Sequence, residues 1–518
     1  MNNKEYKIFF LATLFLLLVS SVTALICPVL INHWINLGEN VSVGKLTILL
    51  LILLASAVLQ LTITYLRERY ARQYNVNNFK KLLRKLFDTN YDYIQKNGMT
   101  NLIELIQEAV NNIYGFMTGS YIAIWGNALI VTVLLVIMAC NSIPVAIMMA
   151  AVVPVNYLGY RFLNSELRKR SEILQRESAQ GFQEIVSYVD STDYVKQCGN
   201  HDIIIKQMQP SIDRMYKAMA DINTFAQGMS QAIQSFNGII QTAILCVVVI
   251  NYLHTDSAIM QMILISIVFP TYFRSVNAIA DANLSKQNYL VSSKFEMELD
   301  AAKEDTGTEK MDSVESVEVD IPILRIANRI LSENINISIQ PGDVIWIRGD
   351  SGKGKSTLVK DLVKFRVNDG IKINNIPISQ YSNESLRQHI SYLSQNIPII
   401  NGTLRDNIFL NHAYNAIREE KLLNSNILGP ILSNKTMNTL IMDKGANLSG
   451  GEKQRIGAAR LLIDNSDLLI LDEITSNLDK RSGRQLLEQI LSDNRGKMVV
   501  IISHDDLPRE YANKVVEL

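Results

Sequence analysis

Apolar residues gather in six long runs in the N-terminal part of the chain. A transmembrane helix needs about 20 mostly apolar residues, and the runs approach or exceed that length. The sequence therefore predicts six membrane-spanning helices, at approximately Ile8–Ile31, Leu46–Leu66, Ile122–Ala139, Ile143–Tyr160, Gln231–Leu253 and Ala258–Phe273.

The first run has a second interpretation, as a signal peptide. Lys4 and Lys7 precede it, and Val22-Thr23-Ala24 is similar to a cleavage site. Its apolar stretch is longer than the about 7–15 residues of a signal-peptide core, and five further runs follow it. We therefore predict that this helix is retained.

Two long polar connections, about Arg67–Ser120 and Arg161–Gly228, hold the cations of the N-terminal part, whereas the short connections are almost free of lysine and arginine. Because cytoplasmic loops carry the excess of positive charge, both termini are predicted to be cytoplasmic in a multi-pass cell-membrane protein. The long connections keep a helical period and contain no proline before Pro210. We expect the membrane helices to continue through them.

The segment Ala301–Glu318 is acidic and poor in large apolar residues, which is typical of a boundary between domains. We therefore expect a membrane domain over residues 1–300, a linker over 301–318 and a second domain over 319–518.

Composition argues against a nucleic-acid partner and against disulfides or cysteine metal ligands. The 50 basic and 50 acidic residues cancel, so net charge gives no reason to expect nucleic acid as a partner. The four cysteines, Cys27, Cys140, Cys198 and Cys246, have no paired spacing. They are interpreted as small apolar residues rather than as disulfides or metal ligands.

A phosphate-binding loop is predicted in the second domain. The apolar run Val344–Ile347 leads into Gly349-Asp350-Ser351-Gly352-Lys353-Gly354-Lys355-Ser356, and a helical pattern follows from Thr357. This strand, glycine-rich loop and helix would present backbone N–H groups to phosphate oxygens. Lys355 would reach the β- and γ-phosphates of ATP, and Ser356 would bind Mg²⁺.

A pair of carboxylates closes a second apolar strand, Leu468–Leu471. Buried parallel strands need such apolar runs, and ligands bind at their carboxyl ends. Asp472 is therefore expected to hold Mg²⁺, and Glu473 to polarise the water that attacks the γ-phosphate.

The sequence Leu448-Ser449-Gly450-Gly451-Glu452-Lys453-Gln454-Arg455, downstream of the phosphate loop, resembles the signature of ATP-binding-cassette (ABC) proteins. The resemblance implies a membrane all-α six-helix exporter-type domain followed by an α/β P-loop ATPase domain of the ABC type. It also implies short transverse coupling helices, near Tyr93–Thr100 and Ser191–Gly199. Within the second of these, Tyr194 is either a coupling residue or an ordinary packing residue.

Further residues match ABC motifs one by one. Gln395, in Ser391-Tyr392-Leu393-Ser394-Gln395, resembles the glutamine that senses magnesium and the attacking water. His504 resembles the switch histidine that contacts the γ-phosphate. Ser476–Asp479 resembles the loop that crosses the dimer interface, and Asp443 an acidic residue that faces the coupling helices.

The family resemblance also implies a dimer. In ABC proteins the residues matching Ser449, Gly450 and Gly451, here followed by Glu452, bind the γ-phosphate held by the partner's phosphate loop. This chain has one membrane half and one cassette, and every catalytic position is intact, so a homodimer is the simpler expectation. A heterodimer stays open.

Two features depart from the family pattern. Met311–Ile345 contains no Phe, Tyr or Trp to stack on adenine, so an isoleucine or Arg325 is expected to cover the base. Lys514–Leu518 is interpreted as the strand after the switch histidine, without the family's usual final helices.

The fifth run and its approach carry a neutral polar stripe, formed by Gln227, Gln231, Gln234, Asn237 and Gln241. Such a stripe lines a cavity or joins helices by hydrogen bonds, and the sequence leaves both open. A neutral polar cavity favours an exported peptide or another amphipathic molecule, with lipid or drug export as the alternative. A membrane sensor with ATPase activity also stays open, whereas the six runs argue against a soluble ABC ATPase acting on nucleic acid.

Overall fold

The computed structural model describes residues 7–19, 30, 34, 42–189, 192–252, 258–326, 329–410, 412–442, 445–464 and 466–518. The chain forms two compact units. The helical unit comprises residues 1–89 and 93–303, and the α/β unit comprises residues 90–92 and 304–518.

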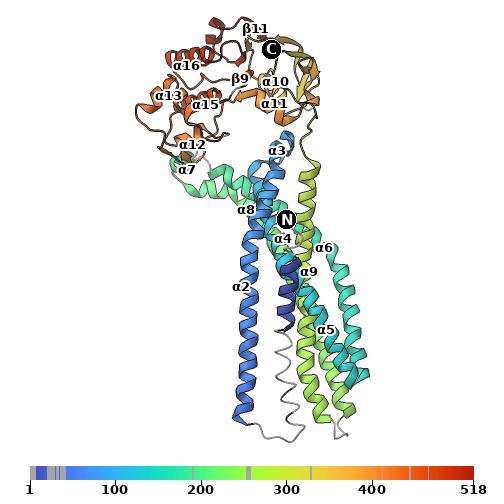
Figure 1. Ribbon diagram of the computed structural model, residues 1–518. Helices are drawn as coiled ribbons and strands as arrows, with labels where there is room; N and C mark the ends of the chain where they lie inside the picture. Colours follow the sequence, from blue (N-terminus) through green and yellow to red (C-terminus); the bar gives the residue numbers. More distant parts are fainter. Residues whose placement is uncertain are drawn as a thin grey trace. The chain divides into compact units, whose positions relative to one another are not determined.

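Long helices make up the helical unit (Figure 1). Their bounds are α2 (Val43–Phe87), α4 (Met99–Gly115), α5 (Tyr121–Asn141), α6 (Ile143–Val189), α8 (His201–Tyr252) and α9 (Ala258–Ala301), with the π-helical turn Phe116–Ser120 between α4 and α5. Two short helices, α3 (Tyr91–Asn97) and α7 (Thr192–Gln197), lie close to the two predicted coupling helices. The helical continuation of the long polar connections is as predicted.

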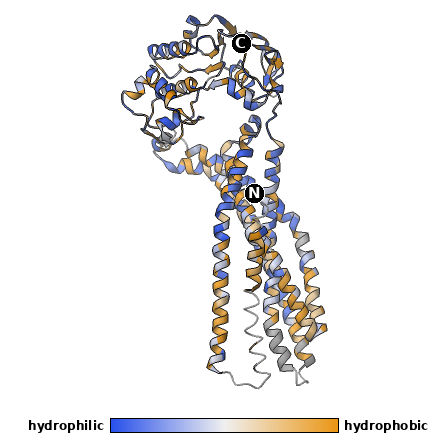
Figure 2. Cartoon of the chain, in the orientation of Figure 1, coloured by the Kyte–Doolittle hydropathy of each residue, from blue (hydrophilic) through white to orange (hydrophobic). Residues whose placement is uncertain are grey.

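Two helices of the described residues, Val43–Phe87 and Met99–Cys140, are long and apolar enough to cross a membrane. The bent pair Ile143–Gly159 and Leu163–Val189 makes a third span if it is counted as one, and Lys7–Val19 is apolar but shorter. Figure 2 shows apolar residues along one half of α2 and polar residues along the other. The fifth and sixth predicted runs fall on α8 and α9, and parts of the first and fifth lie outside the described residues.

The core of the membrane-spanning region joins α5, α6, α8 and α9. Leu134 and Met138 of α5, Met149 of α6 and Phe269 of α9 are nearly inaccessible to solvent. The buried Tyr272 hydroxyl donates to the Met149 carbonyl over 2.7 Å, which satisfies a polar group in an apolar core.

The α/β unit is built on a five-stranded parallel sheet in the order β11-β3-β10-β9-β6. Its strands are β3 (Val344–Arg348), β6 (Ile390–Leu393), β9 (Leu468–Asp472), β10 (Met498–Ile502) and β11 (Lys514–Glu517). An antiparallel sheet in the order β2-β1-β4-β5 contains β1 (Val317–Ile326), β2 (Arg329–Ile339), β4 (Ile371–Ile373) and β5 (Ile376–Pro377). The short strands β7 (Gly402–Thr403) and β8 (Leu440–Ile441) pair with each other.

Successive residues of a strand face opposite sides of the sheet. The side chains of the parallel strands therefore pack alternately into two hydrophobic cores, one on each face. Leu468 and Ile470 pack with α10 and the antiparallel sheet, whereas Leu469 and Leu471 pack with the helices of the other face. The helices of this unit are α10 (Lys355–Leu362), α11 (Asn383–His389), α12 (Leu404–Ile408), α13 (Ala416–Asn424), α14 (Gly429–Leu432), α15 (Gly450–Ile463) and α16 (Lys480–Asp493). This packing aligns the carboxyl ends of β3, β9 and β10, where the candidate site lies.

Candidate functional site

The predicted phosphate loop joins β3 to α10. Gly354 is the N-cap of α10 and has φ +99°, in the left-handed region that favours glycine. A Cβ there would lie 2.8 Å from Leu324 Cδ2, so close packing also requires glycine. Lys355 is buried, and its Nζ donates to the Gly349 carbonyl over 2.5 Å and to the Asp350 carbonyl over 3.2 Å. These bonds hold the ammonium group against the loop backbone.

A cavity of about 520 Å³ opens beside this loop. The predicted residues that line it are Ser351, Gly352, Gly354, Lys355, Ser356, Thr357, Gln395, Glu473 and His504. The other predicted loop residues, Gly349, Asp350 and Lys353, contribute backbone contacts around it. The Lys353 carbonyl accepts from Ser332 Oγ over 2.5 Å, and Gly349 packs against Leu518.

Glu473 follows β9 directly and has φ +52°, an uncommon backbone conformation for a residue other than glycine. Its N–H donates to the Ile502 carbonyl at the end of β10, over 2.9 Å. This turn places the carboxylate between two predicted residues. Glu473 Oε2 accepts from Gln395 Nε2 over 2.7 Å, and Glu473 Oε1 lies 3.2 Å from His504 Nε2.

Asp472, the last residue of β9, is buried beside this carboxylate. Burial and the negative charge of Glu473 raise the pKa of Asp472. The Tyr392 hydroxyl donates to Asp472 Oδ2 over 3.1 Å and opposes that rise. Burial, and then the charge of Asp472, raise the pKa of the Tyr392 phenol, so the phenol remains a proton donor near neutral pH. Tyr392 was not predicted as a site residue, because its contact depends on β6 lying beside β9.

The side chains expected to hold Mg²⁺ fit that ion chemically. Ser356, Gln395 and Asp472 offer hydroxyl, amide and carboxylate oxygens, which are the ligand types that Mg²⁺ prefers. Within the described residues no group of three or more His, Cys, Asp or Glu could hold a metal.

The signature residues begin α15. Ser449 is its N-cap, and a capping box joins it to Glu452, whose Oε2 accepts from the Ser449 N–H over 2.7 Å. Lys435 Nζ lies 2.6 Å from Glu452 Oε1. A Cβ on Gly451 would lie 2.7 Å from Leu478 Cδ2, so the loop Ser476–Asp479 packs directly on the signature. The residues that line the cavity of the phosphate loop do not include the signature of the same chain.

The expectation for the adenine pocket is corrected in one respect. Ile326, Arg329 and Leu331 line the cavity at the junction of β1 and β2, so an isoleucine is present as expected. The arginine at the cavity is Arg329, not Arg325, because Arg325 is an exposed residue of β1 that does not line it. Residues two positions apart in a strand share one face of the sheet. This period could have indicated that Arg329 and Leu331 of β2 face the same side.

The α/β unit also contains three residues from the first long polar connection, Asn90–Asp92. Tyr91 stacks on Phe365, with ring centroids 5.3 Å apart, and Asp92 pairs with Arg366 over 2.8 Å. Phe365 in turn meets the Tyr392 ring edge-on at 6.2 Å. Tyr91 and Asp92 directly precede Tyr93–Thr100, the first of the two predicted coupling helices. Asp443 and the Tyr194 side chain lie outside the described residues.

Comparison with known families decides the identity. The family model described as ABC transporter matches residues 332–476, which hold the phosphate loop, the signature and the carboxylate pair. The model described as ABC transporter transmembrane region matches residues 10–276, just over half of the chain. The chain belongs to the ABC transporter family. One match falls on the helical part of the chain and the other on the part that holds the phosphate loop.

Relatives of this ABC transporter have different names. The "Glutathione/L-cysteine transport system ATP-binding/permease protein CydC" of Haemophilus influenzae is 35% identical over 181 residues, 34% of this chain. The chain spans only 31% of that relative's length, and 35% of the length of a "Probable ABC transporter ATP-binding/permease protein" of the same organism. The "ATP-dependent lipid A-core flippase" of Ralstonia nicotianae is 24% identical over 494 residues, which cover 89% of this chain and 80% of the relative.

A solved structure confirms the predicted ABC transporter fold. The structure of a bacterial Atm1-family ABC exporter with ATP bound superposes with a TM-score of 0.88, at 16% sequence identity. It covers 100% of this chain and 94% of the other. The fold is therefore a helical membrane exporter domain followed by an ABC ATPase domain.

Two residues of the polar stripe of this ABC transporter have different surroundings. Asn237 is almost fully buried and joins three helices: its Nδ2 donates to Asn277 Oδ1 on α9 over 2.7 Å, and its Oδ1 accepts from Asn156 Nδ2 on α6 over 2.9 Å. Asn237 is therefore an inter-helical contact. Gln227 instead lines a cavity of about 200 Å³ between α6, α8 and α9.

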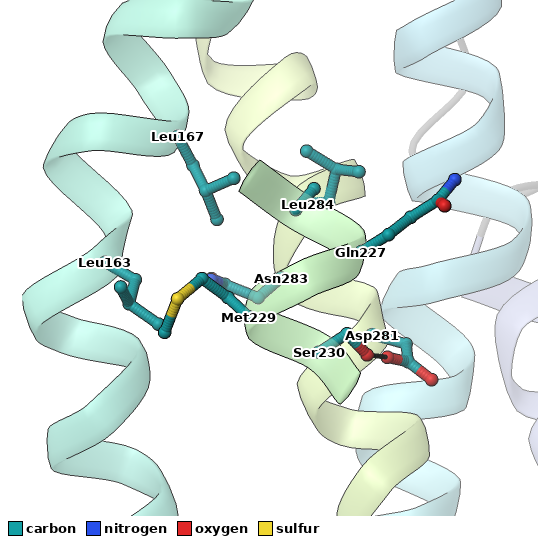
Figure 3. Close-up of a pocket in the computed structure, with 9 residues that line it drawn as sticks. Leu163, Leu167, Gln227, Met229, Ser230, Asp281, Asn283 and Leu284 are labelled. Carbon is teal, nitrogen blue, oxygen red and sulfur yellow. Dashed lines mark hydrogen bonds between the residues drawn. The ribbon is translucent and has the colours of Figure 1, made fainter. Parts of the chain in front are cut away.

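Figure 3 shows that cavity, with Leu163 and Leu167 on α6 and Met229 on α8. The Gln227 amide points away from these three side chains, and Ser230 Oγ donates to Asp281 Oδ1 over 2.6 Å. A larger cavity of about 420 Å³ lies between α5, α6 and α9. Branched apolar residues line it together with Asn156, Tyr157, Asn164, Asn283 and Lys286.

Proposed function

We propose that this ABC transporter is an ATP-driven exporter that works as a dimer by alternating access, with a peptide as cargo. One observation carries the ATPase part of the proposal. The Glu473 carboxylate is held between Gln395 and His504 at the wall of the cavity that the phosphate loop borders. Such a carboxylate can orient a water molecule in line with a phosphoryl group.

Each site residue has a proposed role. The backbone of Gly349–Thr357 binds the phosphates of ATP at the N-terminus of α10, and Lys355 binds the β- and γ-phosphates. Ser356, Gln395 and Asp472 hold Mg²⁺. When bound, the ion supplies positive charge that neutralises the phosphates. Glu473 orients the attacking water, Gln395 fixes the Glu473 carboxylate, and His504 contacts the γ-phosphate. Ile326 and Arg329 cover the base.

The dimer follows from the signature. We propose that Ser449, Gly450, Gly451 and Glu452 complete the ATP site of the partner subunit, since they lie outside the cavity of their own chain. A homodimer is proposed because the chain has all the catalytic residues. ATP binding would close the two cassettes and reorient the membrane domains, and hydrolysis would reset them.

The proposed membrane arrangement is that of the positive-inside rule, with both termini cytoplasmic in the cell membrane. Residues 1–300 form the membrane domain and residues 319–518 the ATP-binding domain, with residues 301–318 between them.

A peptide cargo is supported by the cavity of about 420 Å³, whose wall combines amides with branched apolar residues. Such a surface suits an amphipathic molecule with many hydrogen-bonding groups. Lipid export is the second candidate, because the relative that covers 89% of this chain is named a lipid A-core flippase.

The test uses the full chain in inside-out vesicles. We expect ATP-dependent accumulation of a fluorescently labelled amphipathic dodecapeptide, which Glu473→Gln reduces at least 100-fold because the water-orienting carboxylate is lost. Asp505→Asn, an exposed neighbour of the site, serves as the matched control.

Peptide uptake that Glu473→Gln leaves unaffected would refute the mechanism. A labelled phospholipid that changes leaflets with ATP, in vesicles that accumulate no peptide, would replace the peptide proposal with lipid export. ATP hydrolysis stimulated by either molecule without movement of that molecule would indicate a sensor.

A further inference from the structure

The cavity of about 420 Å³ between α5, α6 and α9 changes from apolar to polar along its length. Val153 of α6 and Val276 of α9 line its apolar end. Towards the other end, Asn283 Nδ2 of α9 donates to Asn164 Oδ1 of α6, which holds the two helices level there. Lys286 follows Asn283 by nearly one helical turn and also lines the cavity.

One stripe of α9 runs the whole length of this cavity. Its lining residues Val276, Ile279, Asn283 and Lys286 recur at intervals of three or four, so they share a face of the helix. From Val276 to Lys286 the stripe is about 15 Å long, at the rise of an α-helix. A ligand that follows this stripe therefore has an apolar body with its polar group at one end.

The polar end of the cavity carries a positive charge without a counter-charge. Among the described side chains that line the cavity, Lys286 is the only charged one. Lys286 is exposed, and no ion pair or hydrogen bond joins its ammonium group to a described residue. Asp281 of the same helix lines the smaller cavity instead, where it accepts from Ser230.

This arrangement favours a ligand with one negative charge. An ammonium group beside apolar side chains attracts an anion more strongly than it would in bulk water, because the local dielectric constant is lower. One lysine balances one carboxylate, whereas a phosphate monoester carries about 1.5–2 negative charges and would need a second cation. A cationic ligand would be repelled.

We propose that Lys286 binds the single carboxylate of an apolar cargo molecule whose body lies against Val131, Val153 and Val276. In the proposed peptide cargo this group is the C-terminal carboxylate, and a fatty acid has the same chemistry. Under the proposed topology, Lys286 lies at the cytoplasmic end of the cavity, from which an exported molecule enters. The inference rests on the proposed export function and narrows the cargo to apolar molecules with one negative charge.

The experiment measures binding to the full chain in phosphatidylcholine nanodiscs, with binding to empty nanodiscs subtracted. The first probe is an N-dansylated hexapeptide of leucine and alanine with a free C-terminal carboxylate. The second probe is its C-terminal amide, which lacks the negative charge and is otherwise nearly identical. The acid is expected to bind at least tenfold more tightly than the amide, the effect of one hydrogen bond between charged groups.

Variants assign this preference to one side chain. Lys286→Gln should abolish the preference for the acid, and Lys286→Arg should keep it. Lys286→Glu should reverse it, because its carboxylate repels the acid and accepts a hydrogen bond from the amide. Lys217→Gln is the matched control, since Lys217 is an exposed lysine of α8 that does not line the cavity.

A third probe identifies the source of the carboxylate. Dodecanoate carries an apolar body and one carboxylate but no peptide bond. Displacement of the peptide acid by an equal concentration of dodecanoate would support the inference with a fatty acid as the ligand. Displacement only at a tenfold or higher excess would support it with a peptide as the ligand.

Equal binding of acid and amide by the unaltered chain would overturn the inference, and this comparison needs no variant. A preference for the acid that persists in Lys286→Gln and Lys286→Glu would also overturn it, because the carboxylate would then bind elsewhere. If inside-out vesicles take up acid and amide equally with ATP, the inference alone fails. Binding of the acid at Lys286 without any ATP-driven uptake would instead refute the proposed function.

Discussion

At the scale of single residues, the Tyr392 hydroxyl determines how readily Asp472 is ionised. Burial raises the pKa of Asp472, and the hydrogen bond from Tyr392 lowers it. A protonated Asp472 would bind Mg²⁺ poorly. Tyr392 thus favours the charged form of its neighbour, against the larger effect of burial.

Tyr392→Phe tests this role. Loss of the hydroxyl raises the pKa of Asp472 further, so the acid side of the ATPase pH profile should move to higher pH. Half-maximal activity at neutral pH should require roughly tenfold more Mg²⁺, the effect of one hydrogen bond to a charged group. Tyr511→Phe is the control, because it removes a similar bond from the exposed Glu488. An unshifted pH profile in Tyr392→Phe would contradict the role.

Ile326 gives a second residue-scale prediction. It lines the cavity beside the phosphate loop, and the segment Met311–Ile345 has no aromatic residue to stack on adenine. Ile326→Tyr should lower the KM for ATP about fivefold or more, since stacking of a base on an aromatic ring stabilises binding by about 1–3 kcal/mol. Ile323→Tyr, on the same strand but away from the cavity, should leave KM unchanged. Similar effects of the two substitutions would show that the base lies elsewhere.

At the scale of elements, an ion pair joins the two short helices α12 and α13. Arg405 of α12 contacts Glu419 of α13 over 2.9 Å, and Glu419 is largely buried. The hydrogen bond from Arg405 holds the pKa of Glu419 below its usual value. A depressed pKa stabilises the fold above the unfolded value of about 4.5, and this stabilisation is lost as pH falls through the folded pKa.

Glu419→Gln should therefore lower the melting temperature of the α/β unit at pH 7 by roughly 3 °C. The difference from the unaltered chain should shrink as the pH falls below about 4.5 and through the lower folded pKa of Glu419. Scanning calorimetry of the full chain at several pH values measures both. Glu420→Gln, at the neighbouring exposed position, should show no such dependence.

The elements were predictable where local signals determine them. The apolar runs before Gly349, Asp472 and His504 identify β3, β9 and β10, because buried parallel strands need continuous apolar sequence. The contacts of Tyr392 and Asn237 were not predictable. The Tyr392 contact depends on β6 lying beside β9, and the Asn237 contacts depend on three helices meeting. Neither arrangement can be predicted from the periodicity of apolar residues in the sequence.

At the scale of the whole molecule, the proposed ATP site combines the phosphate loop of one subunit with the signature of the other. Lys355→Ala damages the loop, and Ser449→Arg places a bulky cation at the signature. Each homodimer should be inactive. A mixed dimer concentrates both defects in one site and leaves the other site intact.

Co-expression of the two variants should therefore restore about a quarter of the ATPase activity, since about half of the dimers are mixed and each has one intact site. Steady-state hydrolysis by the co-purified material measures this. The matched control is Ser449→Arg combined with Lys355→Ala in the same chain, co-expressed with itself. No recovery in the mixed sample would indicate that each chain acts alone or with a different partner.

The left-handed backbone of Glu473 has a consequence for how this protein could evolve. A residue with a Cβ is strained at this φ by roughly 1 kcal/mol, whereas glycine adopts the conformation freely and asparagine adopts it more readily than most residues. Stability of the fold therefore favours glycine or asparagine at position 473, whereas the proposed hydrolysis of ATP requires glutamate there. A population selected only for survival at high temperature would drift toward glycine or asparagine at position 473 and would lose the carboxylate that we propose orients the attacking water.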